Sequence, residues 1–447
     1  MKLLNDDIKR LFFKFLIPSI CGTIVVALYG FVDTIAMGQS AGPNGSAANA
    51  VIVPIFSMAN FLGILCGIGT SVLMSRAKGA GKTEKANAYY TASLFFTGVI
   101  VTAVWVLLLL FRDPVYRILG ASDILLPYVK DYGDLTIAVF PLYALLPYLS
   151  CMLRNDNNPG LVMTATLAGA VINIFGDWYF VFPLGMGIFG AALATALGAF
   201  VQVIIMASHF FTKKCTMKLE RPHRIIPAVR NICINGFGAS FSLLAMIVTT
   251  FIINNQIMRY AGEPELAVYG VLIVLSSLLS NIFTGIGQAV QPIASTNYGA
   301  GQTERCSRVY RLGLITAIIC SALFTLLCIS FPVEINMIFM KVTPEIVAAA
   351  GEVTFIYSLS FIPMAAAVYF TLYFQSVMKA TAATVISVMR GIAASGVFLL
   401  VLPAIFGGDG IWWAVVCAES VTAISAMLYM FISSRRQKTK TNMHKSV

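Results

Sequence analysis

Charged residues are scarce in this sequence. Asp, Glu, Lys and Arg make up 11% of its 447 residues, whereas about 25% is usual in a soluble protein. Hydrophobic residues make up 58%. This balance excludes a water-soluble globular fold. Because a membrane-spanning helix needs about 20 apolar residues, the chain has enough of them for about twelve helices joined by short connections.

Histidine is almost absent, and cysteine shows no pattern. The three histidines, His209, His223 and His444, are expected in solvated loops or at helix ends. The sequence therefore offers almost no histidine to ligate a haem or a zinc ion or to build a proton relay. The nine cysteines lack metal-site or secreted-disulfide spacing. A membrane enzyme would need an acid-rich metal motif or a histidine within a span, and neither is present. The sequence therefore predicts neither an enzyme nor a bound cofactor.

Apolar stretches bounded by Gly, Pro, Asn and charged clusters predict an all-α integral membrane protein. The twelve predicted spans are 12–36, 50–74, 88–111, 126–150, 160–183, 188–211, 232–257, 266–294, 312–332, 353–378, 381–406 and 410–433. Helix bends are expected at prolines within the spans, Pro18 among them.

Basic residues outnumber acidic ones, giving a formal charge of +11. If the N-terminus is inside, most of them fall in inner segments, and the outer loops hold only Arg112, Arg117, Lys130, Arg259 and Lys341. Cytoplasmic loops collect Lys and Arg, so both termini are predicted to be cytoplasmic. The charge then marks one side of the membrane, with anionic lipid as its neighbour, and indicates no nucleic-acid partner.

The chain repeats itself. The loop Gly79–Lys85 recurs as Gly299–Arg305 at an offset of 220 residues, and a Gly-Ile-Gly precedes each copy, at 67–69 and 285–287. Six spans return the chain to its starting side, so the halves are expected to be parallel repeats around a cavity. The predicted parts are an N-lobe at 1–212, a basic cytoplasmic linker at 213–230, a C-lobe at 231–434 and a basic tail at 435–447.

Acidic residues inside apolar spans are the most informative. A charge near the bilayer centre costs about 2.5–3.5 kcal/mol on insertion scales, so it requires burial, pairing or a function. Asp33 lies late in the first span and Asp177 in the outer half of the fifth. Asn173 lies one helical turn before Asp177, on the same face. Thr195, in the adjacent sixth span, adds a hydroxyl.

These four residues form an all-oxygen set, which suits a hard cation such as sodium, whereas two close carboxylates can instead share a proton. The alternative is that each aspartate caps or hydrogen-bonds a neighbouring helix. In the C-terminal half, Arg390 and Glu419 lie in the last two spans. They are interpreted as a structural ion pair or rim groups rather than a second coupling site.

The sequence resembles the multidrug and toxic compound extrusion (MATE) transporters, in the branch related to staphylococcal multidrug pumps. The matching residues are Pro18, Asp33 and Gly38, the Gly-Ala-Gly loop after the second span, Arg154–Pro159, Asn173–Asp177, Gly187–Ala192, Gln288–Gly301 and Gly410–Trp412. The resemblance implies twelve helices in two pseudo-symmetric six-helix lobes that form a V-shaped cavity. It also implies a cation site at Asp33, Asn173, Asp177 and Thr195, and a hinge at Pro18.

The resemblance further implies a secondary active antiporter that exports cationic or amphipathic small molecules in exchange for sodium or protons by alternating access. Candidates for the substrate cavity, or for support of the ion site, are Tyr29, Tyr143, Gln288 and Glu419. We expect a monomer in the cell membrane whose partners are drugs or metabolites and lipid. The alternative function is a flippase for lipid-linked precursors, but the deep charges of the N-lobe are acidic, whereas an anionic headgroup needs basic ones.

Overall fold

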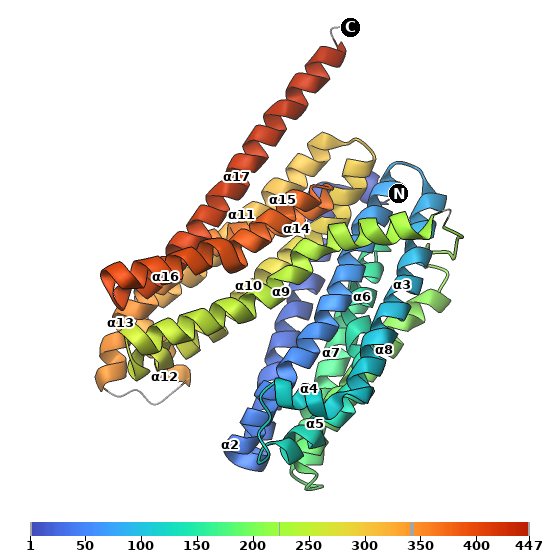
Figure 1. Cartoon of the computed structure of the whole chain (residues 1–447). Helices are drawn as coiled ribbons and strands as arrows, with labels where there is room; N and C mark the ends of the chain where they lie inside the picture. Colours follow the sequence, from blue (N-terminus) through green and yellow to red (C-terminus); the bar gives the residue numbers. More distant parts are fainter. Residues whose placement is uncertain (1, 223, 340–343, 446–447) are drawn as a thin grey trace. The chain divides into compact units, whose positions relative to one another are not determined.

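The computed structural model describes residues 2–222, 224–339 and 344–445, and every regular element in these ranges is helical (Figure 1). The α-helices of the first half are α1 (Lys2–Asn5), α2 (Ile8–Gly79), α3 (Thr83–Leu110), α4 (Arg112–Ile118), α5 (Leu126–Ala138), α6 (Phe140–Asn155), α7 (Pro159–Gly176) and α8 (Gly187–Ala207). Those of the second half are α9 (Ile225–Tyr260), α10 (Glu263–Gly299), α11 (Thr303–Ser330), α12 (Pro332–Phe339), α13 (Pro344–Ser358), α14 (Phe361–Ser376), α15 (Ala380–Val388), α16 (Ala394–Phe406) and α17 (Asp409–Lys445). Two π-helical segments, η1 (Asp177–Val181) and η3 (Met389–Ala393), and a 3-10 helix, η2 (Ser208–Phe211), complete the set.

Among the described residues, nine helices are long and apolar enough to cross a membrane. They are Val51–Gly79, Thr83–Leu110, Pro159–Val181, Gly187–Phe211, Pro264–Gly299, Thr303–Ser330, Pro344–Ser376, Ala380–Phe406 and Asp409–Ser433. A tenth span is formed if α5 and α6, which meet at an angle of 52°, cross together. The chain is therefore a multi-pass membrane protein. Ten of the predicted spans coincide with these helices.

The other two predicted spans, 12–36 and 232–257, fall within α2 and α9. Both stretches contain side chains that lie outside the described residues, so the count of twelve stays a prediction.

Helix α2 contains the first two predicted spans and reverses direction between them. The Lys14 ammonium donates to the side chain of Asn157 at 3.5 Å, and the Asn155 amide donates to the Ser71 carbonyl at 2.6 Å. Lys14 and Ser71 therefore reach the same short loop, whereas a straight α-helix would place them about 85 Å apart at 1.5 Å per residue. The chain between them must fold back, as two antiparallel spans require.

The chain divides into two compact units. The first comprises residues 1–240, 288–309 and 376–378, and the second comprises 241–287, 310–375 and 379–447. Helices α9 and α10 contribute to both. This division does not test the predicted boundaries of the lobes and the linker at 212, 230 and 434, so they stay predictions.

The two repeated loops adopt the same turn. Gly81 and Gly301 have φ values of 74° and 75°, a left-handed conformation that glycine adopts without strain. The helices that lead into the loops cross reciprocally within the first unit: a Cβ on Gly79 would collide with the carbonyl of Thr296, and a Cβ on Gly299 would collide with that of Arg76. Each loop therefore plays the same part in a pseudo-symmetric contact, as an internal repeat predicts.

Candidate functional site

Four helices of the first unit bring the candidate ion site together. Asp33 comes from α2, Tyr132 from α5, Asn173 from α7 and Thr195 from α8. All but Thr195 are less than 8% exposed. Helices α7 and α8 lie side by side (Figure 1). They approach closely because Gly198 has no side chain: a Cβ there would lie 2.7 Å from the Gly169 carbonyl oxygen.

A continuous hydrogen-bond chain links these residues. The Asn173 amide donates to the Thr195 hydroxyl at 3.0 Å, and that hydroxyl donates to Asp33 Oδ1 at 3.1 Å. The Tyr132 hydroxyl donates to Asp33 Oδ2 at 2.9 Å. Both oxygens of the Asp33 carboxylate therefore accept a hydrogen bond, which fixes the orientation of this side chain.

Asp177 differs from Asp33 because its carboxylate has no protein partner. It is 1% exposed, and neither oxygen has a hydrogen-bond donor among the described residues. Asn173 Oδ1, one helical turn away, is buried and equally without a donor. Asp33 interacts electrostatically with Asp177. Within the described part of the chain, these three buried oxygens have no donor, so they are able to bind an ion or a proton.

Asp177 also begins the π-helical segment η1, which continues α7 to Val181. Single π-helical turns inside α-helices are rare and occur frequently at functional sites. Asp177 therefore lies where the regular α-helical hydrogen-bond pattern of its span is interrupted.

The arrangement suits a small cation or a proton. A buried carboxylate without a donor is costly unless it is protonated or binds a cation. Carboxylate, amide and hydroxyl oxygens are the ligands of hard cations. The residues present therefore fit a sodium ion, and each carboxyl group can equally bind a proton.

Of the residues identified from sequence, the structure links Asp33, Asn173 and Thr195 directly and places Asp177 one turn from Asn173. Sequence reasoning missed Tyr132, which donates to Asp33 and is 1% exposed. The sequence contains no signal for this contact, because the neighbours Lys130, Asp131 and Asp134 are charged and do not indicate a buried tyrosine.

Of the other candidates, Tyr143, Gln288 and Pro18 have described side chains. Tyr143 packs in the core of the first unit, its ring 4.7 Å from that of Phe56, which in turn contacts Tyr132. Gln288, in α10, has a buried Oε1 without a donor. Pro18 lies in α2. The side chain of Tyr29 lies outside the described residues.

Arg390 and Glu419 form an ion pair, as the sequence analysis expected. Arg390 Nε lies 2.9 Å from Oε1 and 3.0 Å from Oε2 of Glu419, and both side chains are largely buried within the second unit. Glu419 is therefore held by Arg390.

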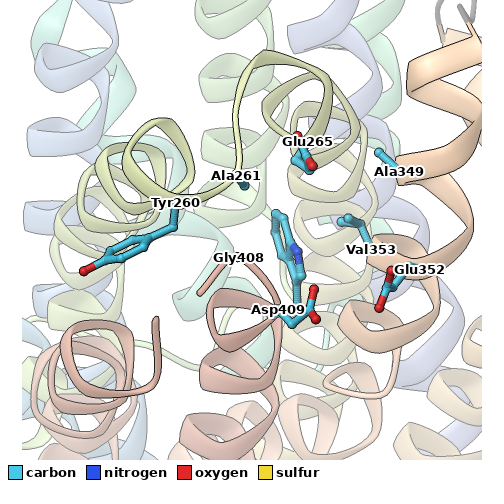
Figure 2. A pocket seen from close by; sticks show the side chains of 9 residues that line it. Tyr260, Ala261, Glu265, Ala349, Glu352, Val353, Gly408 and Asp409 are labelled. Atoms are coloured by element: carbon cyan, nitrogen blue, oxygen red, sulfur yellow. The ribbon is translucent and has the colours of Figure 1, made fainter. Parts of the chain in front are cut away.

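A cavity of about 260 Å³ opens in the second unit (Figure 2). Three acids, Glu265, Glu352 and Asp409, line it together with Trp412. The sequence analysis interpreted none of these acids as part of a site.

One expectation is wrong in part. His209 was predicted to lie in a solvated loop or at a helix end. It lies at a helix end, in η2 directly after α8, but it is 0% exposed and its ring contacts Asp156. Its two ring nitrogens face Asp156 and Asn158 of the loop between α6 and α7, a contact between segments distant in sequence that local polarity does not predict.

Comparisons with known proteins show the family of this chain. The MatE family model matches residues 18–179 and 239–397. The chain belongs to the MatE family. The two matches begin 221 residues apart (239 minus 18), close to the offset of 220 between the repeated loops. The family model therefore detects both halves of the chain.

A curated relative is the multidrug export protein MepA of Staphylococcus haemolyticus, 24% identical over 96% of this chain and 94% of its own. A solved structure described as the outward-facing conformation of a multidrug resistance MATE family transporter superposes with a TM-score of 0.90 at 23% identity, covering 98% of each chain. A MOP superfamily transporter from Pyrococcus furiosus, described as having a binding pocket of reverse polarity that suggests a different function, superposes with a TM-score of 0.87 at 22% identity, over 97% of this chain and 98% of its own. These structures share the MatE fold of this chain.

Proposed function

We propose that this protein is a secondary active multidrug exporter, an antiporter that moves cationic or amphipathic small molecules outward in exchange for sodium or protons. One observation carries the proposal: among the described residues, the buried carboxylate of Asp177 has no hydrogen-bond donor, whereas both oxygens of the Asp33 carboxylate in the same unit accept one. An intramembrane acid without a partner is a functional site by default. Membership of the MatE family and the names of the relatives supply the substrate class.

The proposal includes a topology. Twelve spans in two lobes, with both termini cytoplasmic, agree with the concentration of Lys and Arg in the inner segments of the sequence. The protein acts as a monomer in the cell membrane, without a cofactor and without enzymatic activity. Its partners are its cationic substrates and the surrounding lipid.

Coupling follows from differential binding. An ion that binds Asp33 and Asp177 from outside favours the helix arrangement in which its ligands are closest, and a substrate favours the other arrangement. Each ligand then lowers the affinity for the other, as exchange requires. Pro18, in the same helix as Asp33, is the proposed hinge. Exchange of one monovalent cation for a monovalent drug moves no net charge, so voltage alone does not drive it.

The flippase alternative requires the opposite electrostatics. A lipid pyrophosphate headgroup needs deep basic residues, whereas the buried site of the first unit carries Asp33 and Asp177. The relative from Pyrococcus furiosus illustrates that pocket polarity, and not fold alone, distinguishes functions within this superfamily.

The test is ethidium efflux from cells that express the protein, with and without external sodium and at two external pH values. We expect wild-type export to depend on one of the two ions and to be lost in Asp33→Asn. The matched control is Asp123→Asn, which makes the same change at an exposed loop carboxylate paired with Arg117. It retains export. The proposal fails if correctly inserted wild-type protein exports nothing, or if Asp33→Asn and Asp123→Asn behave alike.

A further inference from the structure

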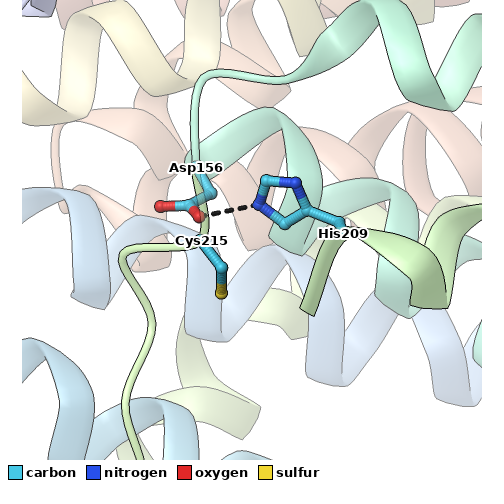
Figure 3. Close-up of side chains that lie close together, drawn as sticks. All are labelled: Asp156, His209 and Cys215. Carbon is cyan, nitrogen blue, oxygen red and sulfur yellow. Dashed lines mark hydrogen bonds and ion pairs between the residues drawn. The ribbon is translucent and has the colours of Figure 1, made fainter. Parts of the chain in front are cut away.

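Three segments of the first unit converge at one polar cluster, away from the ion site. Asp156 lies between α6 and α7, His209 in η2, and Cys215 in the chain that follows η2. Each offers one ligand atom, and these atoms all lie within 4.8 Å of one another (Figure 3). The side chains of Asp156 and His209 are each 1% exposed.

The hydrogen bonds around Asp156 fix its orientation. His209 Nε2 lies 2.8 Å from Oδ2, and the backbone N–H of Thr216 donates to the same oxygen at 2.9 Å. The other oxygen, Oδ1, faces the Lys78 ammonium at 3.3 Å and the Thr216 hydroxyl. Oδ2 is therefore the oxygen turned toward the histidine, whereas Oδ1 is engaged by a cation.

The histidine is also held from behind. The Asn158 side-chain amide lies 3.1 Å from His209 Nδ1. A metal-binding histidine typically has a hydrogen-bond partner on its second ring nitrogen, which sets the tautomer and the ring plane. The amide can donate or accept after a flip, so it serves the ring in either protonation state.

We propose that Asp156, His209 and Cys215 form a binding site for a zinc-like divalent transition metal. Carboxylate, imidazole and thiolate are the three ligand types that Zn²⁺ takes in proteins, and three protein ligands leave the fourth tetrahedral position for water. A sulfur and a nitrogen ligand exclude Mg²⁺ and Ca²⁺ as the preferred ions. The site is independent of the proposed transport function.

Binding requires small movements and a balanced exchange of protons. Burial raises the pKa of the Cys215 thiol, so the thiol is protonated in the metal-free protein. The metal takes the place of the thiol proton and of any proton between His209 and Asp156, and these protons pass to water. The bound ion then connects the segment after η2 to the loop between α6 and α7.

The experiment uses the full-length protein in detergent without a polyhistidine tag. After equilibration with micromolar Zn²⁺ and removal of the excess, metal analysis is expected to find about one zinc per chain. Cys215→Ser and His209→Gln are expected to reduce the affinity at least about 10-fold, on the scale of losses known for disturbed metal sites. With Co²⁺ in place of Zn²⁺, the wild type should show thiolate-to-cobalt charge-transfer absorption that Cys215→Ser lacks.

The matched control is Cys320→Ser, which removes another half-buried thiol, in α11 of the second unit. It should bind zinc like the wild type. Melting curves in chelator verify that each variant is folded. The proposal is overturned if folded wild-type protein takes up no more zinc than folded Cys215→Ser, or if its cobalt spectrum shows no thiolate band.

Discussion

The fifth predicted span of each half contains a π-helical segment, and the two segments treat a charged side chain in opposite ways. In the first half, η1 begins at Asp177, whose buried carboxylate has no donor among the side chains that the structure describes. In the second half, η3 contains Arg390, which binds both oxygens of Glu419. The same backbone irregularity therefore presents an available charge in one half and a neutralised charge in the other.

The hydrogen bonding around the two π-helical segments also differs. The carbonyl of Gly391 in η3 accepts a 2.6 Å hydrogen bond from Thr249 of another helix, and the Arg390 carbonyl accepts one from Ser395. Side chains thus compensate the backbone groups that a π-helical turn leaves exposed. At η1 the unsatisfied groups are the side chains themselves. The charge at η3 is therefore neutralised within the fold, whereas the proposed ion site needs the charge at η1 to be available.

The largest effect is expected from breaking the pair in the second half. Glu419→Gln leaves the buried Arg390 guanidinium without a counter-charge, which costs about 3–5 kcal/mol of stability in comparable sites. The apparent melting temperature in detergent should fall substantially. Replacing both residues, as Arg390→Met with Glu419→Leu, should restore most of it, because a well-packed apolar pair needs no charge compensation. A double variant as unstable as Glu419→Gln would instead assign Glu419 a role beyond pairing.

Asp177→Asn tests the opposite side of the comparison. No protein donor is lost, and an unpaired buried acid is removed, so the melting temperature should be unchanged or higher. Ion-dependent export should fall about 10-fold or more, within the usual range of coupling energies. The measurement is drug efflux from proteoliposomes under an imposed sodium or proton gradient, alongside melting curves. A variant that is destabilised as strongly as Glu419→Gln would show that Asp177 is structural.

Hydropathy and spacing alone predict much of this molecule. Apolar length predicted ten spans that coincide with helices, because the bilayer fixes the length of a span. The cost of intramembrane charge drew attention to Asp33 and Asp177, and helical periodicity placed Asn173 beside Asp177. The recurrence of the Gly79 loop at Gly299 predicted an internal repeat, and the helices that precede these loops cross reciprocally in the structure.

What the sequence did not predict depends on tertiary packing. Tyr132 reaches Asp33 only because α5 packs against α2 and α8, and nothing near residue 132 encodes that approach. The contact of the buried His209 with Asp156 is likewise a property of the assembled unit. The π-helical turn at Asp177 requires backbone geometry that periodicity does not resolve.

Tyr132→Phe gives a smaller effect and separates the two carboxylates of the first half. It removes one donor from Asp33 and leaves Asp177 untouched, so it tests whether the hydrogen-bond chain prepares the site. A hydrogen bond to a buried group contributes about 1 kcal/mol, which corresponds to about a 5-fold change in affinity. The apparent affinity for the coupling ion should change by that factor in transport assays, while maximal export at saturating ion is retained. Complete loss of export would instead place Tyr132 among the groups that bind the ion.

The smallest effect is expected from an ion pair that is not buried. Arg308 Nη2 lies 2.6 Å from Glu304 Oε1, one helical turn apart on α11, but the two side chains are 66% and 80% exposed. Water screens such a pair, so Glu304→Gln should cost only about 0.3–0.5 kcal/mol. Its melting temperature should stay close to that of the wild type, although the contact is shorter than that between Arg390 and Glu419. If Glu304→Gln and Glu419→Gln destabilise the protein equally, contact length rather than burial governs these pairs, and the distinction between the two halves loses its physical basis.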